Sequence, residues 1–419
     1  MTAQTQADVT IVGAGIVGIC CALSLQEKGK RVRLIDKDAP GQGASHGNAG
    51  VISPWSCVPQ SMPGLWKKIP GMLLDPEGPV AVRPAYLPKF LPWAVRFLRA
   101  GRADRVAEIS AAMAALVRPN VDIYRRHLAG TGHEHLVQAS WYVHLYRDAA
   151  AADLNGLGWR LRAAEGAPIE IVSGDELREI EPCVSPDYQA AILVKDQARA
   201  LSPGRIGAVL ADKVRALGGE VLRTRVHRLQ RDGDGWSLAT DEGELRSAQV
   251  VTAAGAWSLG LLEPFGLRLP LVSERGYHLL FRSPGVTLAN SVVDVEAKFV
   301  TSSMEMGLRS AGTAEFARAD AKPNDARARM LAKQTKRILP DLDTADTEAW
   351  MGVRPSLPDS LPCIGEVPGQ PGLFTAFGHS HYGLGMAPMT GRIVADLATG
   401  TRPNLDLSPY SLTRFGRFH

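Results

Sequence analysis

Hydrophobic and polar positions at the start of the chain predict a strand, a tight turn, a helix and a second strand. Residues 9–12 form a short apolar run, and apolar residues at helical spacing follow over residues 16–25. A second apolar run occupies residues 32–35. This order of a short strand, a helix and another short strand is typical of a parallel strand–helix–strand unit.

Three glycines and one acid give this unit a candidate chemistry. Gly13, Gly15 and Gly18 stand where the first strand turns into the helix, and Asp36 ends the second strand. Glycines at this spacing allow a tight turn, let backbone amides approach a pyrophosphate and let the helix pack on the strand. A carboxylate after the second strand can accept hydrogen bonds from an adenosine ribose. The segment therefore predicts dinucleotide binding, without distinguishing NAD from FAD.

The rest of the chain alternates between helical and extended patterns. Strands are predicted over residues 140–146, 220–226 and from Gln249 into the small residues 253–256, and a hairpin is predicted at 232–235. Helices are predicted over 103–126, from Ser173 to Ile180, and over 203–217, 326–339 and 383–397. The helix at 103–126 is expected to carry the chain across a second domain.

Residues 52–101 combine many prolines with aromatic and basic side chains. The prolines predict that no long amphipathic helix forms there. One interpretation is that the segment forms a lid over a substrate site. Another is that it is a long connection packed on its own domain. The alternative is a patch that rests on an anionic membrane surface, because aromatic and basic residues together suit such a surface.

Composition limits the possible classes of protein. A chain of 419 residues predicts two domains, and a net charge of +4 from 47 basic and 43 acidic residues gives no argument for nucleic acid binding. Five cysteines without a CxxC spacing argue against a structural metal or a disulfide framework. Without a signal peptide or a membrane-spanning apolar run, we expect a cytoplasmic protein, with peripheral contact to the inner face of a membrane as an alternative.

The C-terminal part carries a second glycine-rich turn into a helix. Residues 373–377 are apolar, Gly378-His379-Ser380-His381-Tyr382-Gly383 follow, and a helix is predicted after them. A helix N-terminus carries partial positive charge. We therefore expect this turn to point at the same anionic cofactor as the first one.

Five separated segments resemble the D-amino-acid oxidase superfamily of flavoproteins, and within it the D-amino-acid dehydrogenase small subunits and D-hydroxyproline dehydrogenases. The segments are the N-terminal unit with Asp36, residues 45–50, residues 253–258, residues 352–359 and residues 378–384. The resemblance implies an α/β fold in which a Rossmann-like FAD-binding domain (1–85, 200–270 and 345–419) accompanies an α+β substrate domain (86–199 and 271–344) built on a mostly antiparallel sheet.

The resemblance also implies that the cofactor is FAD. The residues expected to bind it are Gly13, Ala14, Gly15, Ile16, Val17, Gly18, Asp36, Lys37, Ser45, His46, Asn48, Ala49, Gly50, Val51, Val226, Ala254, Gly255, Trp257, Gly352, Arg354, Gly378, His379, Gly383 and Leu384. Sarcosine- and dimethylglycine-type relatives attach flavin covalently through a histidine in a turn like 45–50. Because His46 lies one position too early and Gly47 fills the matching place, we expect noncovalent FAD.

The substrate side departs from the family pattern. Relatives usually grip the substrate carboxylate with an arginine from the strand before residues 312–315, and alignment places Ser303 there. The candidate groups that replace it or take part in catalysis are Arg354, Arg275, His379, His381 and Tyr277. For Arg354 a structural role at the proline-rich turn stays equally open, and Tyr277 is also compatible with a place in the core.

The implied activity is oxidative deamination of a D-amino acid by hydride transfer from the α-carbon to flavin, which gives an imino acid that hydrolyses to a 2-oxo acid. The first alternative is dehydrogenation of a secondary amine such as D-hydroxyproline, proline or sarcosine. The second is a flavin-binding subunit with little activity alone. The expected partners are a small amine substrate and an electron acceptor, which is oxygen, a quinone or an electron-transfer protein.

Overall fold

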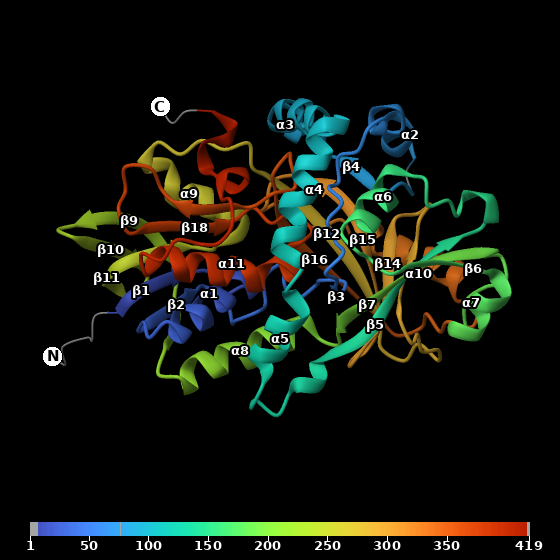
Figure 1. The fold of residues 1–419 in the computed structure, drawn as a ribbon, viewed down its shortest axis with the longest axis horizontal. Coiled ribbons are helices and arrows are strands. Elements are labelled where there is room, and N and C mark those ends of the chain that lie inside the picture. The colour runs from blue at the N-terminus through green and yellow to red at the C-terminus, as the bar shows by residue number, and fades with distance from the viewer. Residues whose placement is uncertain (1–6, 76, 417–419) are drawn as a thin grey trace.

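Two β-sheets form the framework of the protein in the computed structural model, which describes residues 7–75 and 77–416 (Figure 1). The sheet on the left of Figure 1 is built around parallel strands, and the sheet on the right is mostly antiparallel. The predicted α/β fold is confirmed. Residues 1–6, 76 and 417–419, which the domain prediction placed in the FAD-binding part, lie outside the described residues.

The first sheet is formed by the predicted dinucleotide unit and by strands far from it in sequence. Its order is β17 (Cys363–Glu366), β18 (Leu373–Phe377), β11 (Gly243–Thr252), β1 (Ala7–Val12), β2 (Val32–Asp36) and β8 (Glu220–Arg223), and β9 (Val226–Asp232) and β10 (Gly235–Thr240) form a hairpin beside β11. Neighbours from β18 to β8 pair in parallel. These apolar strands are buried because helices cover the sheet.

Helix α1 (Ile16–Glu27) packs against α8 (Pro203–Ala216) and α11 (Gly383–Ala398). At the α1–α11 contact a Cβ on Gly391 would lie 2.4 Å from the carbonyl oxygen of Cys20, so only glycine permits this approach. Helices α4 (Ala103–Val117) and α5 (Asn120–Leu128) also pack on α11 and share its hydrophobic core. The expectation that residues 103–126 cross the second domain is therefore wrong.

The second sheet provides the broad antiparallel surface. Its order is β16 (Thr347–Ser356), β12 (Val272–Phe281), β15 (Gly307–Phe316), β14 (Phe299–Met304), β13 (Ser291–Asp294), β5 (Val137–Tyr146), β7 (Ala190–Ala200) and β3 (Val51–Ile52), with β4 (Val80–Val82) on β15 and β6 (Ile169–Ser173) on β7. The predicted domain boundaries are wrong at β3, β4 and β16, because all three strands belong to this sheet.

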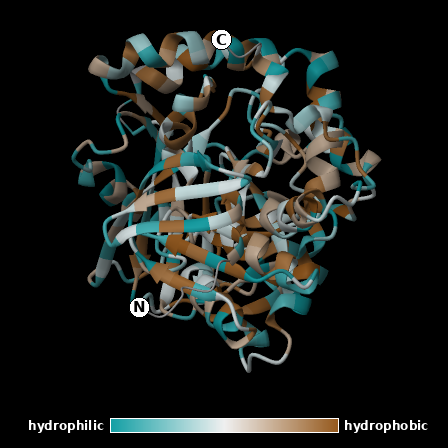
Figure 2. Ribbon diagram, turned by 90° about the vertical axis from the view of Figure 1, so that its left-hand side faces the viewer, coloured by the Kyte–Doolittle hydropathy of each residue, from teal (hydrophilic) through white to brown (hydrophobic). Residues whose placement is uncertain are grey.

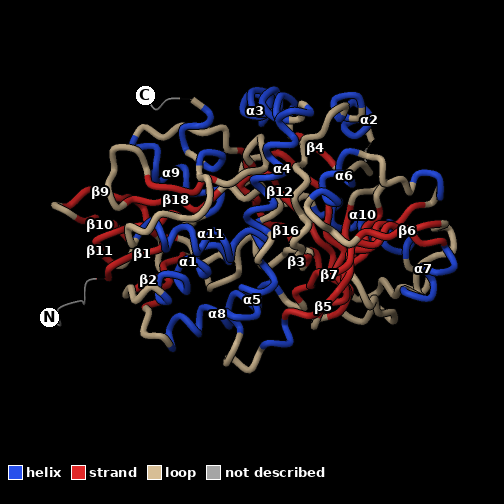
Figure 3. The backbone as a smooth tube through the Cα atoms, in the orientation of Figure 1, coloured by secondary structure: helices blue, strands red, loops and turns tan. Residues whose placement is uncertain are grey.

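Helices α6 (Leu157–Ala164), α7 (Gly174–Ile180) and α10 (Asp325–Ile338) accompany the second sheet, as Figure 3 shows in blue beside the red strands. Ser173 and Glu176 form the predicted N-terminal cap of α7, each side chain bonding the other's backbone N–H. The remaining short helices are α9 (Ser258–Leu262) and the single 3-10 turns Leu65–Lys67, Pro84–Tyr86, Glu134–Leu136, Ala149–Ala151, Gly255–Trp257, Glu263–Phe265, Ser408–Tyr410 and Leu412–Phe415.

The proline-rich segment contains α2 (Ile69–Leu74) and the 14-residue helix α3 (Leu87–Ala100), so the expectation that prolines exclude a long amphipathic helix is wrong. Pro88 lies in the first turn, where no intrahelical N–H is needed, and Pro92 removes one hydrogen bond. The buried Trp93 compensates by stacking on Phe97 at 4.9 Å and contacting Phe316 at 5.2 Å.

Hydrophobic and hydrophilic residues alternate along the helices at the top of Figure 2, the level at which α3 lies in Figure 1. Within residues 7–75 and 77–416, each helix is too short or too polar to cross a membrane.

Candidate active site

A cavity of about 1170 Å³ is lined by residues of both sheets and by α2 and α3. Its walls include the turn between β1 and α1, the end of β2, residues 43–51, the end of β11, and residues of β12, β15 and β16. Pockets for small molecules usually measure about 300–1,000 Å³. The cavity therefore has room for a dinucleotide and a small substrate together.

The nucleotide end of the cavity is shaped by the predicted glycines. A Cβ on Gly13 would lie 2.4 Å from the carbonyl oxygen of Ala253, and one on Gly18 would lie 1.9 Å from that of Gly13. Gly15 differs, because its Cβ position faces open space beside Ser45. The three glycines thus provide the tight turn, the close helix packing and the exposed backbone that a pyrophosphate needs.

Asp36 lines the same end of the cavity. One carboxylate oxygen accepts a hydrogen bond from the N–H of Ala14 at 2.7 Å, and the other accepts one from Asp38 at 3.1 Å. Burial raises the pKa of Asp36. Each oxygen keeps a lone pair for a further donor, so the carboxylate fits the role predicted for it toward a ribose.

The turn at residues 45–50 is held in place from the second sheet. One guanidinium nitrogen of Arg309 donates to the carbonyl oxygens of His46 and Asn48, both at 2.9 Å. Trp350 packs against Gly47, where a Cβ would lie 1.8 Å from the indole ring. Ser45, Asn48, Ala49 and Val51 of this segment line the cavity.

His46 does not line the cavity. Its Nδ1 is buried, faces Gly204 and has no hydrogen-bond partner, while its ring contacts Trp350 at 5.7 Å. Burial lowers the pKa of His46. The histidine thus packs behind the turn, which is a different place from the one predicted.

Acid precipitation is expected to release FAD into the supernatant, because the only histidine in the turn points behind it. His46→Ala is expected to retain as much yellow cofactor as the wild type. Flavin colour that stays in the acid pellet of the wild type would contradict a noncovalent cofactor.

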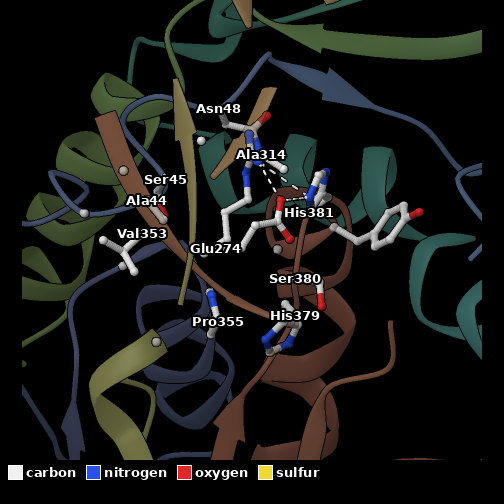
Figure 4. A pocket seen from close by; sticks show the side chains of 18 of the residues that line it. Ala44, Ser45, Asn48, Glu274, Ala314, Val353, Pro355, His379, Ser380 and His381 are labelled. Carbon is white, nitrogen blue, oxygen red and sulfur yellow. Dashed lines mark hydrogen bonds and ion pairs between the residues drawn. The ribbon is translucent and has the colours of Figure 1, made fainter. Parts of the chain in front are cut away.

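The substrate end of the cavity contains a buried carboxylate between two basic side chains. Glu274 of β12 accepts a hydrogen bond from Arg354 of β16 at 2.9 Å, another from His381, and one from the Ser356 hydroxyl at 2.6 Å. In Figure 4 Glu274 and His381 point toward one another. Burial alone would raise the pKa of Glu274, but His381 and Arg354 hold it well below its ordinary value.

A glycine makes room for this cluster. The guanidinium of Arg354 crosses Gly276, where a Cβ would lie 2.2 Å from the guanidinium carbon. Arg354 also donates to the carbonyl oxygen of Thr313 at 3.3 Å. Arg354 lines the cavity, and the carbonyl that it bonds belongs to Thr313 of β15 rather than to the proline-rich turn.

The two histidines of the second glycine-rich turn lie differently, and both line the cavity. His379 is buried and its Nε2 lies 3.0 Å from the Thr390 hydroxyl of α11. Burial lowers the pKa of His379 to about 3, so the imidazole is neutral at physiological pH. His379 points away from Glu274 in Figure 4, and His381 is therefore the histidine that joins the charged cluster.

Arg275 and Tyr277 do not line the cavity. Arg275 is fully buried with a guanidinium nitrogen 3.3 Å from Glu315, and the Tyr277 hydroxyl donates to the same carboxylate at 2.6 Å. Strand alternation explains the error, because neighbours Glu274 and Arg275 face opposite sides of β12. Their placement behind the sheet corrects the expectation that they contact substrate.

Ser303 likewise does not line the cavity; its hydroxyl accepts a hydrogen bond from the N–H of Leu288 at 2.8 Å. Among the predicted cofactor residues, those that do not line the cavity are Ala14, Gly18, His46, Gly50 and Gly378. Gly50 and Gly378 have positive φ angles of 83° and 86°, so they shape the turns on either side of the cavity.

All other predicted cofactor residues line the cavity. They are Gly13, Gly15, Ile16, Val17, Asp36, Lys37, Ser45, Asn48, Ala49, Val51, Val226, Ala254, Gly255, Trp257, Gly352, Arg354, His379, Gly383 and Leu384. Cavity residues that the sequence prediction missed include Glu274, Tyr142, His144, Arg162 and Tyr382. For Tyr142 and His144 the available signal was their place on alternate positions of the strand predicted over residues 140–146.

Comparisons with known proteins agree with this geometry. The family model described as DAO, FAD dependent oxidoreductase, matches residues 8–397. The chain is 38% identical over 415 residues to a D-amino-acid oxidase of Bradyrhizobium diazoefficiens, covering 97% of this chain and 98% of the relative. It is 31% identical to a D-amino acid dehydrogenase of Paramagnetospirillum magneticum, covering 97% and 98%.

Among solved structures, glycine oxidase from Geobacillus kaustophilus superimposes with a TM-score of 0.74 at 24% identity, covering 98% of this chain and 99% of that one. This likeness concerns the fold. The family match over nearly the whole chain and the relatives above 30% identity show membership directly. The chain belongs to the DAO family of FAD-dependent oxidoreductases.

Proposed function

We propose that the protein catalyses oxidative deamination of a D-amino acid. The observation that carries the proposal is a single cavity with a dinucleotide cradle at one end and the cluster of Glu274, Arg354 and His381 at the other. The relative with 38% identity, named a D-amino-acid oxidase, supports the choice of substrate class. Bound FAD supplies the chemistry by accepting a hydride from the substrate α-carbon.

The protein residues position the substrate and receive its proton. Glu274 is ionised and accepts the Nε2–H of His381, which leaves Nδ1 of that imidazole as a proton acceptor. Burial lowers the pKa of His381, so the ring is available in its neutral form. The imino acid then hydrolyses in water to a 2-oxo acid and ammonia.

A panel of D- and L-amino acids, proline derivatives and N-methyl amines tests the proposal. The FAD-loaded protein is incubated with each compound and an artificial electron acceptor, and 2-oxo acids are trapped as hydrazones. We expect hydrazones from D-amino acids and none from their L-enantiomers. Turnover restricted to secondary amines would assign the protein to amine dehydrogenation, and no turnover at all would favour a flavin-binding subunit.

His381→Ala is expected to slow anaerobic flavin reduction by roughly tenfold or more, the effect of losing about 1.4 kcal/mol in the transition state. The matched control is His135→Ala, which removes a histidine whose side chain is 56% exposed. Wild-type reduction kinetics in His381→Ala would remove this residue from the mechanism.

We also propose that α3 rests on an anionic membrane surface. Leu87, Leu91, Val95 and Leu98 form one exposed apolar stripe on this helix, and Lys89, Arg96 and Arg99 accompany it. Leu91 and Leu98 also line the cavity, so the test uses Val95, an exposed position of the stripe that does not line it. Val95→Asp should abolish co-sedimentation with vesicles containing phosphatidylglycerol. Equal sedimentation of this variant, or no sedimentation of the wild type, would show that the stripe has another role.

A further inference from the structure

Arg162 of α6 is a cation that lines the cavity and has no carboxylate partner within residues 7–75 and 77–416. One guanidinium nitrogen donates to the carbonyl oxygen of Gly158 at 3.3 Å, and the guanidinium lies 4.9 Å from the centre of the Trp159 ring. Within residues 7–75 and 77–416, the groups that act on its charge are Cys57 and the three tyrosines 142, 146 and 382. Burial lowers the pKa of Arg162, whereas these four groups raise it.

Two polar groups on β5 also face this region without a partner. Tyr142 lines the cavity, and its hydroxyl makes no hydrogen bond within the described residues. His144 also lines the cavity, and its buried Nε2 has no hydrogen-bond partner in the same part of the chain. The rings of Tyr142 and His144 contact at 4.6 Å, and His144 contacts Trp159 at 4.8 Å. A buried polar atom without a partner, such as the Nε2 of His144, calls for a ligand or water, and the half-buried Tyr142 hydroxyl lies in the same region.

The other buried arginines near the cavity are already engaged. Arg354 is paired with Glu274, Arg309 holds two carbonyl oxygens of the 45–50 turn, and Arg275 lies beside Glu315 behind the sheet. Lys298 also lines the cavity with no carboxylate partner among the described residues, but it is exposed, whereas Arg162 is half-buried. Arg162 is therefore a partly desolvated cation of the cavity wall that no described carboxylate pairs with.

The sheet order places Tyr142 away from the charged cluster. Glu274 and Arg354 come from β12 and β16, whereas Tyr142 comes from β5, on the other side of β15 and β14. Between them β15 contributes the small residues Ala311, Gly312 and Ala314 to the cavity wall. A small molecule can thus lie over this wall with a different polar group at each end.

We propose that Arg162, assisted by Tyr142, binds the carboxylate of the amino-acid substrate. A guanidinium can pair with both oxygens of a carboxylate, and a phenol adds a third donor. Arg162 thereby replaces the strand arginine that is absent at Ser303. The inference rests on the proposed function for the identity of the substrate, but the binding of a carboxylate can be measured without turnover.

Benzoate and its neutral isostere benzamide are the probes, and the readout is the change they cause in the visible absorption of the FAD-loaded protein. We expect the wild type to bind benzoate and Arg162→Met to bind it at least 30-fold more weakly. Arg162→Lys should recover part of the affinity, and Tyr142→Phe should lose several-fold. Arg160→Met, on the exposed side of the same helix, is the control and should bind benzoate like the wild type.

Benzamide separates binding from structural damage. Its weak binding should be the same in the wild type and in Arg162→Met, with unchanged thermal stability. Three results would overturn the proposal. Arg162→Met could bind benzoate within threefold of the wild type, it could lose affinity for benzoate and benzamide equally, or the wild type could bind neither compound. If benzoate binding depends on Arg162 but no amino acid reduces the flavin, the carboxylate site stands and the proposed function fails.

Discussion

Glu274→Ala is expected to lower the free energy of unfolding by about 3 kcal/mol, because it leaves the half-buried Arg354 guanidinium without its carboxylate. The carboxylate is 2% exposed and accepts hydrogen bonds from Arg354, His381 and Ser356. Without this carboxylate, the contacts of the Arg354 guanidinium within the described residues are a hydrogen bond to the carbonyl oxygen of Thr313 at 3.3 Å and an approach to His381 Nε2 at 3.5 Å. Chemical denaturation of the two proteins at pH 7 measures the loss.

An exposed ion pair provides the control for this prediction. Glu296 accepts a hydrogen bond from Arg147 at 2.9 Å, and its side chain is 60% exposed. Glu296→Ala is expected to cost less than about 1 kcal/mol. Similar losses in both variants would mean that the Glu274 cluster does not stabilise the fold more than a surface pair does.

The stabilisation by Glu274 should also depend on pH in a defined direction. His381 and Arg354 hold its pKa below the ordinary value in the folded protein, so the unfolded state takes up a proton first as the pH falls. The difference in stability between the wild type and Glu274→Ala should therefore be complete near neutral pH. It should shrink once the pH falls below the ordinary range of a glutamate.

Asp36→Ala is expected to lose FAD during purification while the protein remains folded. The variant removes charge-assisted hydrogen bonds to the ribose, each of which contributes about 1.5–3 kcal/mol. It also removes the acceptor for the N–H of Ala14, which holds the glycine turn against β2. The ratio of flavin to protein absorbance after gel filtration, together with far-ultraviolet circular dichroism, measures both effects.

Asp38→Ala is the matched control for cofactor retention. Asp38 lies two residues away and also lines the cavity, but its carboxylate pairs with Lys37 at the surface. We expect this variant to keep nearly full flavin occupancy. Full occupancy in Asp36→Ala would remove Asp36 from the cofactor site.

The nucleotide half of the site could be predicted because local rules determine it. Gly13 and Gly18 have conformational or packing requirements that only glycine meets, Gly15 keeps the backbone between them uncovered, and Asp36 follows a buried strand at a fixed spacing. The same local rules located α8, α10 and α11 to within a residue or two. These elements depend on contacts between residues close in the sequence.

The substrate half depends on pairing between distant strands, which the sequence pattern does not reveal. Glu274 and Arg354 meet only because β12 pairs with β16 in one particular register. Side chains alternate between the two faces of β12, so the sequence prediction could name Arg275 as a candidate without showing that it faces away from the cavity. In α3, the tertiary contacts of Trp93 outweigh the local effect of Pro92.

The central claim is that one cavity holds FAD and a D-amino acid together. The most direct measurement is the visible spectrum of the FAD-loaded protein under anaerobic conditions, recorded before and after addition of each enantiomer of the same amino acid. The account predicts that at least one D-enantiomer bleaches the flavin band while its L-enantiomer leaves it unchanged. A flavin band that no D-amino acid bleaches would contradict the account.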